Sequence, residues 1–247
     1  MKVFNSRAFN GRGYFLTFFY FCLVCLIGFS AARQGLSHYY SDTAFRTGLD
    51  TDAAAAIYYQ SENPDAYKTR GVIFLRNKDY PAAVAAFEKA ISLRENDFLL
   101  WLRLGYSRFQ LKDFDAAQTA YRKAILLAPN YSQPNYYMGM MLLETDPRGQ
   151  AFQFLSKAAA YDPEFYPEIL HLVRITFPGD PQSIERFLRP ESAEARKIVA
   201  RYFIKHDFMT DNTKAFLVAD ELSESEKNEF IESLIEKQNF EVAREVI

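Results

Sequence analysis

The chain has 247 residues, of which 49% are hydrophobic and 24% are charged, a composition typical of folded proteins that excludes wholesale disorder. Its formal net charge is −2, and because the first 33 residues contain no acid, the rest carries 25 basic against 31 acidic groups. A mildly acidic body lacks the clustered Lys and Arg that neutralise phosphates. We therefore expect no nucleic-acid partner.

The first predicted element is a membrane anchor. Residues 14–32 run for 19 positions without a charge, and a helix of that length spans roughly 28 Å, close to the hydrocarbon thickness of a bilayer. Lys2, Arg7 and Arg12 precede the run. The positive-inside rule then predicts a cytoplasmic basic tail over 1–13, a single transmembrane helix over 14–32, and an extracytoplasmic body, periplasmic in a bacterium. The alternative is a signal peptide cleaved near Ala32, with a secreted body, because residues 30–32 are small.

Residues 33–63 are predicted to be a linker followed by an N-terminal capping helix, which we expect over 42–60. Both cysteines of the chain, Cys22 and Cys25, fall inside the apolar run. Two thiols cannot supply the four ligands of a structural metal site, so we interpret them as apolar residues of a membrane helix.

An internal repeat organises the next hundred residues. A shift of 34 residues places Gly105 on Gly71 and Gly139, and it also superimposes two sets of alanines and one set of large apolar residues. Glycine within a helix costs about 1 kcal/mol relative to alanine, so its recurrence indicates that two helices cross closely there. The residues predicted to pack each repeat in this way are Gly71, Ala83, Phe87, Ala90, Gly105, Ala117, Tyr121, Ala124, Gly139, Ala151 and Ala158.

These motifs resemble the tetratricopeptide repeat family. The family signature of W-x2-L-G, A-x3-F and a closing proline is similar to Trp101 to Gly105, Ala117 to Tyr121, and Pro129. The resemblance covers residues 64–165, as three repeats over 64–97, 98–131 and 132–165. It implies an all-α fold, a right-handed superhelical solenoid of antiparallel helix pairs, here preceded by one transmembrane helix.

The pattern decays after Pro163. Residues 166–247 are predicted to form degenerate helical pairs, the last of them incomplete. Its apolar residues, Phe240, Val242, Ala243, Val246 and Ile247, would then lie on an unfinished end of the solenoid, where a polar capping helix is expected. This C-terminal face is one predicted site for a protein partner.

The first helix of each repeat carries a second, mostly apolar stripe besides the one that closes its own hairpin. In the resembled family this face lines a concave groove that binds partner proteins, and aromatic residues there favour an apolar or amphipathic segment. The alternative is that these side chains pack on the adjoining repeat or on the C-terminal helices. The candidate groove residues are Lys68, Val72, Leu75, Arg76, Arg103, Tyr106, Phe109, Tyr136, Tyr137 and Met140.

No enzyme activity is predicted. The three histidines, His38, His171 and His206, are scattered and have no metal-ligand spacing, and nucleophile elbows and phosphate-binding loops are absent from the sequence. We therefore expect no catalytic residue, no metal and no cofactor. The predicted function is a membrane-anchored scaffold for protein–protein interaction, in assembly or stabilisation of an envelope or membrane-associated complex. A holdase-like accessory to secretion and a permanent structural subunit of a large membrane complex remain as alternatives.

Overall fold

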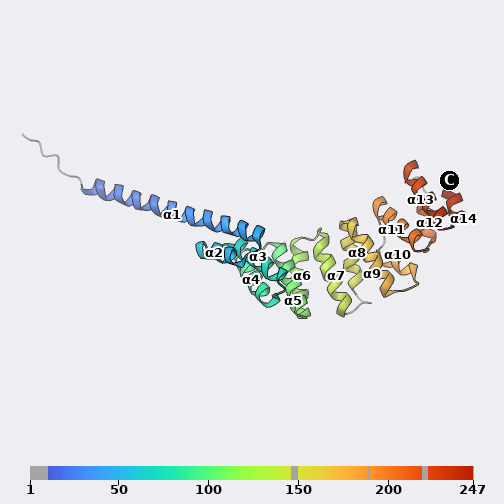
Figure 1. The fold of residues 1–247 in the computed structure, drawn as a ribbon, viewed down its shortest axis with the longest axis horizontal. Coiled ribbons are helices and arrows are strands. Elements are labelled where there is room, and N and C mark those ends of the chain that lie inside the picture. Colours follow the sequence, from blue (N-terminus) through green and yellow to red (C-terminus); the bar gives the residue numbers. More distant parts are fainter. Residues whose placement is uncertain (1–10, 146–149, 189, 219–221, 247) are drawn as a thin grey trace, which may run out of the picture. The chain divides into compact units, whose positions relative to one another are not determined.

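The structure is a computed structural model that describes residues 11–145, 150–188, 190–218 and 222–246, with the side chains of 11–17 and 181 left out. Every regular element within these ranges is helical (Figure 1). The chain divides into two compact units, Met1–Asn96 and Asp97–Ile247. The predicted cytoplasmic tail lies outside the described residues as far as residue 10.

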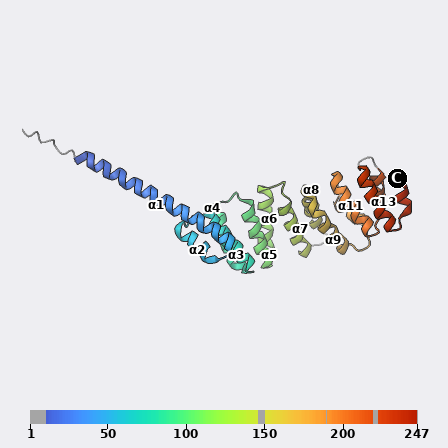
Figure 2. The same ribbon diagram turned by 45° about the horizontal axis from the view of Figure 1, so that its top comes forward.

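The first unit contains four helices: α1 (Gly11–Thr47), α2 (Asp50–Tyr59), α3 (Pro64–Arg76) and α4 (Tyr80–Leu93). The predicted linker is wrong at its start, because α1 continues without interruption from the apolar run to Thr47. The helix expected over 42–60 is also broken, since Gly48 has φ +73° and turns the chain into α2. Both views show α2 lying beside the C-terminal half of α1 (Figures 1 and 2).

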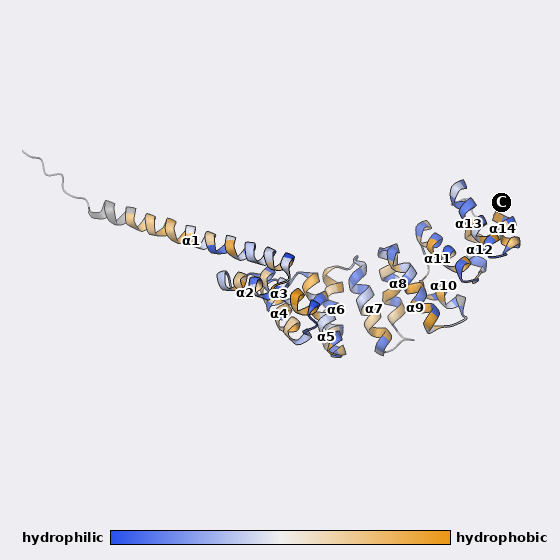
Figure 3. Ribbon diagram, viewed as in Figure 1, coloured by the Kyte–Doolittle hydropathy of each residue, from blue (hydrophilic) through white to orange (hydrophobic). Residues whose placement is uncertain are grey.

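The two halves of α1 have different surroundings. Between residues 18 and 36 its side chains are exposed apart from the half-buried Cys22, and this stretch is the hydrophobic part of the helix (Figure 3). From Ser37 onward one side of the helix is buried, with Ser37, Ser41 and Ala44 at helical spacing against α2 and α3. Among the described residues, α1 is the one helix long and apolar enough to cross a membrane.

A chain of buried polar contacts fixes α1 to the first repeat. The Ser37 hydroxyl donates to the Ala56 carbonyl at 2.7 Å, and the Asn63 amide nitrogen donates to the Ser37 hydroxyl at 2.8 Å. The Asn63 side-chain oxygen in turn accepts from the Asp65 backbone N–H at 3.0 Å and so caps α3. Because each polar atom has a partner, the burial of Ser37 and Asn63 stabilises one arrangement of the three helices.

The second unit begins with two helix pairs, α5 (Phe98–Gln110) with α6 (Phe114–Leu127) and α7 (Ser132–Thr145) with α8 (Ala151–Tyr161). The 3₁₀ turn η1 (Pro163–Phe165) leads to three further pairs. These are α9 (Tyr166–Thr176) with α10 (Pro181–Leu188), α11 (Ala193–Lys205) with α12 (Asp211–Val218), and α13 (Glu224–Glu236) with α14 (Phe240–Val246).

All eleven residues predicted to pack the repeats are buried. A Cβ atom added at Gly71 would lie 2.6 Å from the ring of Phe87, and one added at Gly105 would lie 2.6 Å from the ring of Tyr121. At Gly139 the same distance separates the added atom from Leu155. Glycine is therefore required because the large residue of the second helix lies directly on the backbone of the first. Each of these large side chains lies within its own hairpin, and the Tyr121 ring also stacks on Tyr137 of the next pair, with ring centres 6.4 Å apart.

The predicted unfinished C-terminal face is largely wrong. Val242, Ala243 and Val246 are buried in a cluster with residues of α12 and α13 such as Leu217 and Leu234, whereas Phe240 is 61% exposed. Ile247 lies outside the described residues. The pair α13–α14 therefore closes its own apolar stripe on α12, and of the described residues predicted to be exposed there only Phe240 is open to solvent.

Candidate protein-binding surface

The predicted groove residues of the first unit have separate roles in the structure. Val72 is buried in the helix pair, and Leu75 is half-buried. Lys68 donates to the Asp65 carboxylate at 2.7 Å. Arg76 is exposed and its guanidinium lies 5.8 Å from the centre of the Phe45 ring. The stripe on α3 therefore contributes to packing and to ion pairs more than to an apolar contact surface.

The ion pairs around Asp65 give stability a defined pH dependence. Arg94 donates two hydrogen bonds to the Asp65 carboxylate, at 3.0 and 2.8 Å, and these with Lys68 lower the pKa of Asp65 from 3.8 to about 2. Between pH 4 and 2 the unfolded chain binds the proton more readily than the folded one, so this contribution is present above pH 4 and is lost as the pH falls to 2.

We expect Asp65→Asn to be less stable than the natural sequence at pH 7 and to approach it as the pH falls from 4 to 2. Urea midpoints of both proteins, measured across that range, check this. A stability difference that stays constant down to pH 2 would contradict it.

The second unit carries a continuous line of rings, which we call the aromatic row: Tyr106 on α5, Tyr137 and Tyr136 on α7, and Phe165 on η1. Ring centres are 5.8 Å apart between Tyr106 and Tyr137, 5.6 Å between Tyr137 and Tyr136, and 4.8 Å between Tyr136 and Phe165. All four side chains are half-buried. The two contacts between tyrosines are edge-on and the one between Tyr136 and Phe165 is tilted. Such contacts hold each ring in place and leave part of it open to a ligand.

One end of the aromatic row is also part of the core. Tyr136, Met140 and Leu143 pack against the buried cluster formed by α8 to α11. The Tyr136 hydroxyl donates to the Glu168 carboxylate at 2.5 Å, and burial together with this bond raises the pKa of Tyr136. For these residues the structure follows the packing alternative left open by the sequence.

The remaining candidates differ in how they are covered. Phe109 packs near Phe114 at 6.0 Å, and the ammonium group of Lys112 lies 5.4 Å from the Phe109 ring centre. Lys112 is itself paired with Glu144 at 2.6 Å. Arg103 is half-buried on the same helix as Tyr106. Phe109 and Tyr137 also pack against the buried cluster that contains Tyr121. Tyr106 and Tyr137 are each half-buried, and the candidate contact surface is centred on these two rings.

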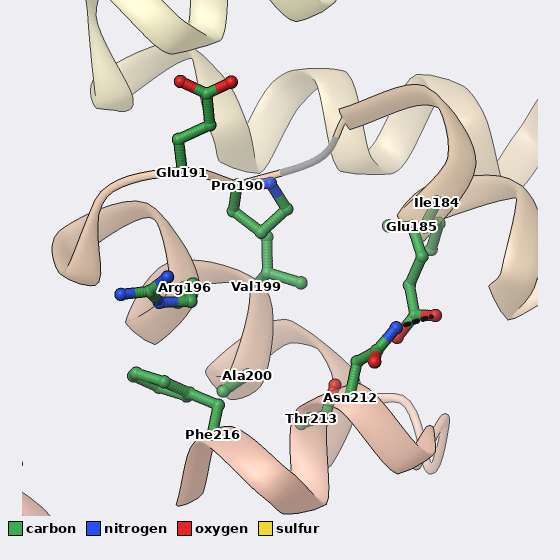
Figure 4. A pocket seen from close by; sticks show the side chains of 10 residues that line it. All are labelled: Ile184, Glu185, Pro190, Glu191, Arg196, Val199, Ala200, Asn212, Thr213 and Phe216. Atoms are coloured by element: carbon green, nitrogen blue, oxygen red, sulfur yellow. Dashed lines mark hydrogen bonds between the residues drawn. The ribbon is translucent and has the colours of Figure 1, made fainter. Parts of the chain in front are cut away.

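Sequence reasoning missed two features of this unit. Phe165 joins the aromatic row, although it follows the closing Pro163 and carries no repeat motif. A cavity of about 450 Å³ also lies between α10, α11 and α12 (Figure 4). Its lining combines apolar and polar groups: Ile184, Glu185, Pro190, Glu191, Arg196, Val199, Ala200, Asn212, Thr213 and Phe216.

Several polar groups of this cavity have structural partners. Glu185 accepts hydrogen bonds from the Thr210 hydroxyl and from Asn212, the latter at 3.0 Å, and the Arg196 guanidinium lies 5.6 Å from the Phe216 ring centre. Over the described part of the chain, no three His, Cys, Asp or Glu side chains are grouped as a metal site. Nδ1 of His171 lies 3.3 Å from a terminal guanidinium nitrogen of Arg174, and the His206 ring packs on the Tyr202 ring.

Comparison with known proteins agrees with this architecture. Residues 43–98 and, overlapping them, 68–133 match the family model described as tetratricopeptide repeat. The peroxisomal targeting signal receptor of Candida albicans is 32% identical over 80 residues, which are 32% of this chain and 14% of the receptor. Tetratricopeptide repeat protein 37 of Xenopus laevis is 34% identical over 56 residues, 23% of this chain and 4% of that protein.

A solved structure extends the likeness along the chain. PilF of Pseudomonas aeruginosa superimposes with a TM-score of 0.52 at 15% identity, covering 87% of this chain and 97% of PilF. At that identity the likeness concerns the fold alone. The chain therefore contains tetratricopeptide repeats, and the predicted all-helical fold of that class is confirmed. The family match begins at residue 43, so it includes α2 as well as the first two predicted repeats.

Proposed function

We propose that this chain is a membrane-anchored scaffold that binds a partner protein through the aromatic row of its repeats. The observation that carries the proposal is the partial exposure of Tyr106 and Tyr137, on the first helices of two successive pairs. Their rings meet edge to edge at 5.8 Å and belong to a repeat type whose members bind proteins. A surface of fixed tyrosine rings favours an apolar or amphipathic segment of the partner, because each ring offers a large contact area at low entropic cost.

The membrane part of the proposal rests on α1. Leu26, Ile27 and Phe29 are 60–65% exposed and project from a helix segment that makes no buried contact. Burying such a segment in a bilayer removes its apolar surface from water. The basic residues before it favour a cytoplasmic N-terminus and an extracytoplasmic repeat domain. Anchoring would confine the binding surface near the membrane and raise its effective concentration for partners in the same complex.

The test is a pull-down of the full chain in mild detergent with two matched tyrosine variants. Tyr106→Ala is expected to lose a stoichiometric partner, whereas Tyr161→Ala, which removes a 47% exposed tyrosine on α8, is expected to retain it. We avoid Tyr136 because it bonds Glu168 and packs into the adjacent core. Thermal melts of both variants control for folding, and the affinity of the purified partner is then measured for each.

The outcomes separate the alternatives. A partner lost only with Tyr106→Ala, at an unchanged melting temperature, supports the proposal. A defined partner that both variants retain would contradict the proposed site and favour a permanent subunit held through another face. Many unrelated clients, captured equally by both variants, would instead favour the holdase-like accessory.

A further inference from the structure

The end of α2 lies beside α1 at the level where the apolar stretch of α1 ends. Arg33, the first charged residue after that stretch, donates from Nε to the Tyr59 carbonyl at 2.9 Å and from a terminal nitrogen to the Tyr58 carbonyl at 3.3 Å. These carbonyls belong to the last turn of α2, which carries the negative end of the helix dipole. Arg33 therefore fixes the C-terminal end of α2 next to the apolar segment.

Four tyrosines gather around this junction, and we call them the tyrosine collar: Tyr39 and Tyr40 on α1, and Tyr58 and Tyr59 on α2. Tyr40 stacks on Tyr59 with ring centres 5.5 Å apart and an interplanar angle of 10°. Each also meets its sequence neighbour edge-on at 5.4 Å, Tyr40 with Tyr39 and Tyr59 with Tyr58. The two outer rings are open to the surroundings, Tyr39 at 64% and Tyr58 at 78%.

The position of the collar matches the boundary layer of a bilayer. Arg33 follows directly on the predicted span, and the headgroup layer beyond the hydrocarbon core is about 6 Å thick on each side. The backbone carbonyls of Tyr58 and Tyr59 lie at the level of Arg33, which they bind, while the Cα atoms of Tyr39 and Tyr40 follow about 10 Å further along α1. Helical side chains lean toward the N-terminus of their own helix. The α1 tyrosines therefore lean toward the apolar stretch and those of the antiparallel α2 lean away from it, and the stacked rings of Tyr40 and Tyr59 meet between these two levels.

The chemistry of the collar also suits that layer. A tyrosine ring has an apolar body and a polar tip, and Tyr is enriched where hydrocarbon meets water. An arginine at the end of a membrane helix places its charge among the headgroups. An aqueous surface would give no comparable gain for two exposed rings held rigidly beside an apolar helix.

We propose that the tyrosine collar and Arg33 lie in the lipid headgroup layer and set the depth and tilt of the first repeat against the membrane. This inference rests on the membrane-spanning role of α1 within the proposed function. It adds a second, peripheral contact between bilayer and protein, made by α2. Because Ser37 and Asn63 link α1, α2 and α3 through buried hydrogen bonds, the depth of the collar also fixes the depth of α3.

Depth-dependent fluorescence quenching tests this in the full chain reconstituted into phosphatidylcholine vesicles. Trp101→Phe removes the single natural tryptophan. Three probes are then introduced one at a time: Phe21→Trp in the apolar stretch, Tyr58→Trp in the collar, and Phe45→Trp on α1 about 18 Å beyond Arg33. All three positions are at least half exposed, so the substitutions disturb little packing, and circular dichroism verifies the helical content.

Lipids brominated near the methyl end of the acyl chain are expected to quench the tryptophan at 21. The tryptophan at 58 is expected to be quenched more strongly by lipids brominated near the headgroup than by lipids brominated near the methyl end. The probe at 45 is expected to keep its emission with both. Quenching at 21 without quenching at 58 would overturn the collar while leaving the span intact. Equal quenching at 58 and 45 would overturn it in favour of a domain lying flat on the surface, and no quenching at 21 would overturn the membrane span itself.

Discussion

Replacing Tyr121 with alanine is expected to lower the free energy of unfolding by about 3–5 kcal/mol, whereas replacing it with phenylalanine leaves that energy unchanged or raises it by about 1 kcal/mol. The ring is fully buried, lies on the backbone of Gly105 and stacks on Tyr137. Alanine would leave a cavity at the centre of the helix pair. Among the described groups, however, the Tyr121 hydroxyl has no hydrogen-bond partner, and burial raises the pKa of Tyr121.

The buried hydroxyl therefore lowers the free energy of unfolding, and replacing the tyrosine with phenylalanine removes this unfavourable contribution. The first repeat has phenylalanine at the equivalent position, Phe87. Urea unfolding followed by the fluorescence of Trp101, which packs in the same cluster, measures both variants. Tyr161→Ala is the control, expected to change stability by less than about 0.5 kcal/mol because its side chain is 47% exposed. If Tyr121→Phe were as unstable as the alanine variant, the assignment of an unsatisfied hydroxyl would be wrong.

The repeat core could be predicted because its signal is local and periodic. A glycine that recurs at the same position of each repeat, inside a helix, indicates close approach of another side chain to the backbone. The structure confirms this, because each predicted glycine contacts the large residue 16 positions later in the sequence. The short turns between the two helices of a pair also depend on local residues. Lys78 and Lys112 adopt positive φ directly before the capping residues Asp79 and Asp113, which accept from the N–H groups of Ala82 and Ala116.

The same turn could have predicted the closed C-terminal pair. Gln238 adopts φ 58°, and the Asn239 N–H bonds the Leu234 carbonyl, just as the Asp113 N–H bonds the Arg108 carbonyl. The sequence Gln238-Asn239-Phe240 thus parallels Lys112-Asp113-Phe114. Because the repeat spacing has changed by that point, the 34-residue period does not align the two turns, and in the sequence the apolar residues of α14 therefore resemble an open end.

Two other features depend on contacts distant in sequence. Glu168 and Phe165, the two partners of Tyr136, follow the closing Pro163 of the third repeat, where no periodic motif fixes the register. The composition of the sequence does not predict that α1 continues to Thr47, because residues 33–47 are polar enough to resemble a linker. No proline interrupts them before Gly48, and Ser37, Ser41 and Ala44 follow helical spacing. Small polar residues in a buried stripe have a weaker sequence signal than apolar ones.

Asn63→Ala is expected to lower the free energy of unfolding by about 2–3 kcal/mol, more than the loss of a helix cap alone, because two effects add. Losing the acceptor for the Asp65 N–H costs about 1 kcal/mol at the start of α3. Losing the donor to the Ser37 hydroxyl leaves a fully buried oxygen with one contact fewer, at a further cost of about 1–2 kcal/mol. Asp79→Ala, which removes an exposed cap of α4, isolates the first effect and is expected to cost about 1 kcal/mol.

The two variants also differ in where the protein loosens. In native-state hydrogen exchange, Asn63→Ala is expected to raise the exchange rates of α1 amides from Ser37 to Thr47, whereas Asp79→Ala leaves them unchanged and affects α4. If both variants lost equal stability and α1 stayed protected in both, the Asn63–Ser37 bond would add nothing to the attachment of α1. If α1 loosens as expected, a single amide side chain couples the apolar helix to the first repeat, and Asn63→Ala becomes the means of separating the attachment of α1 from the folding of the repeats.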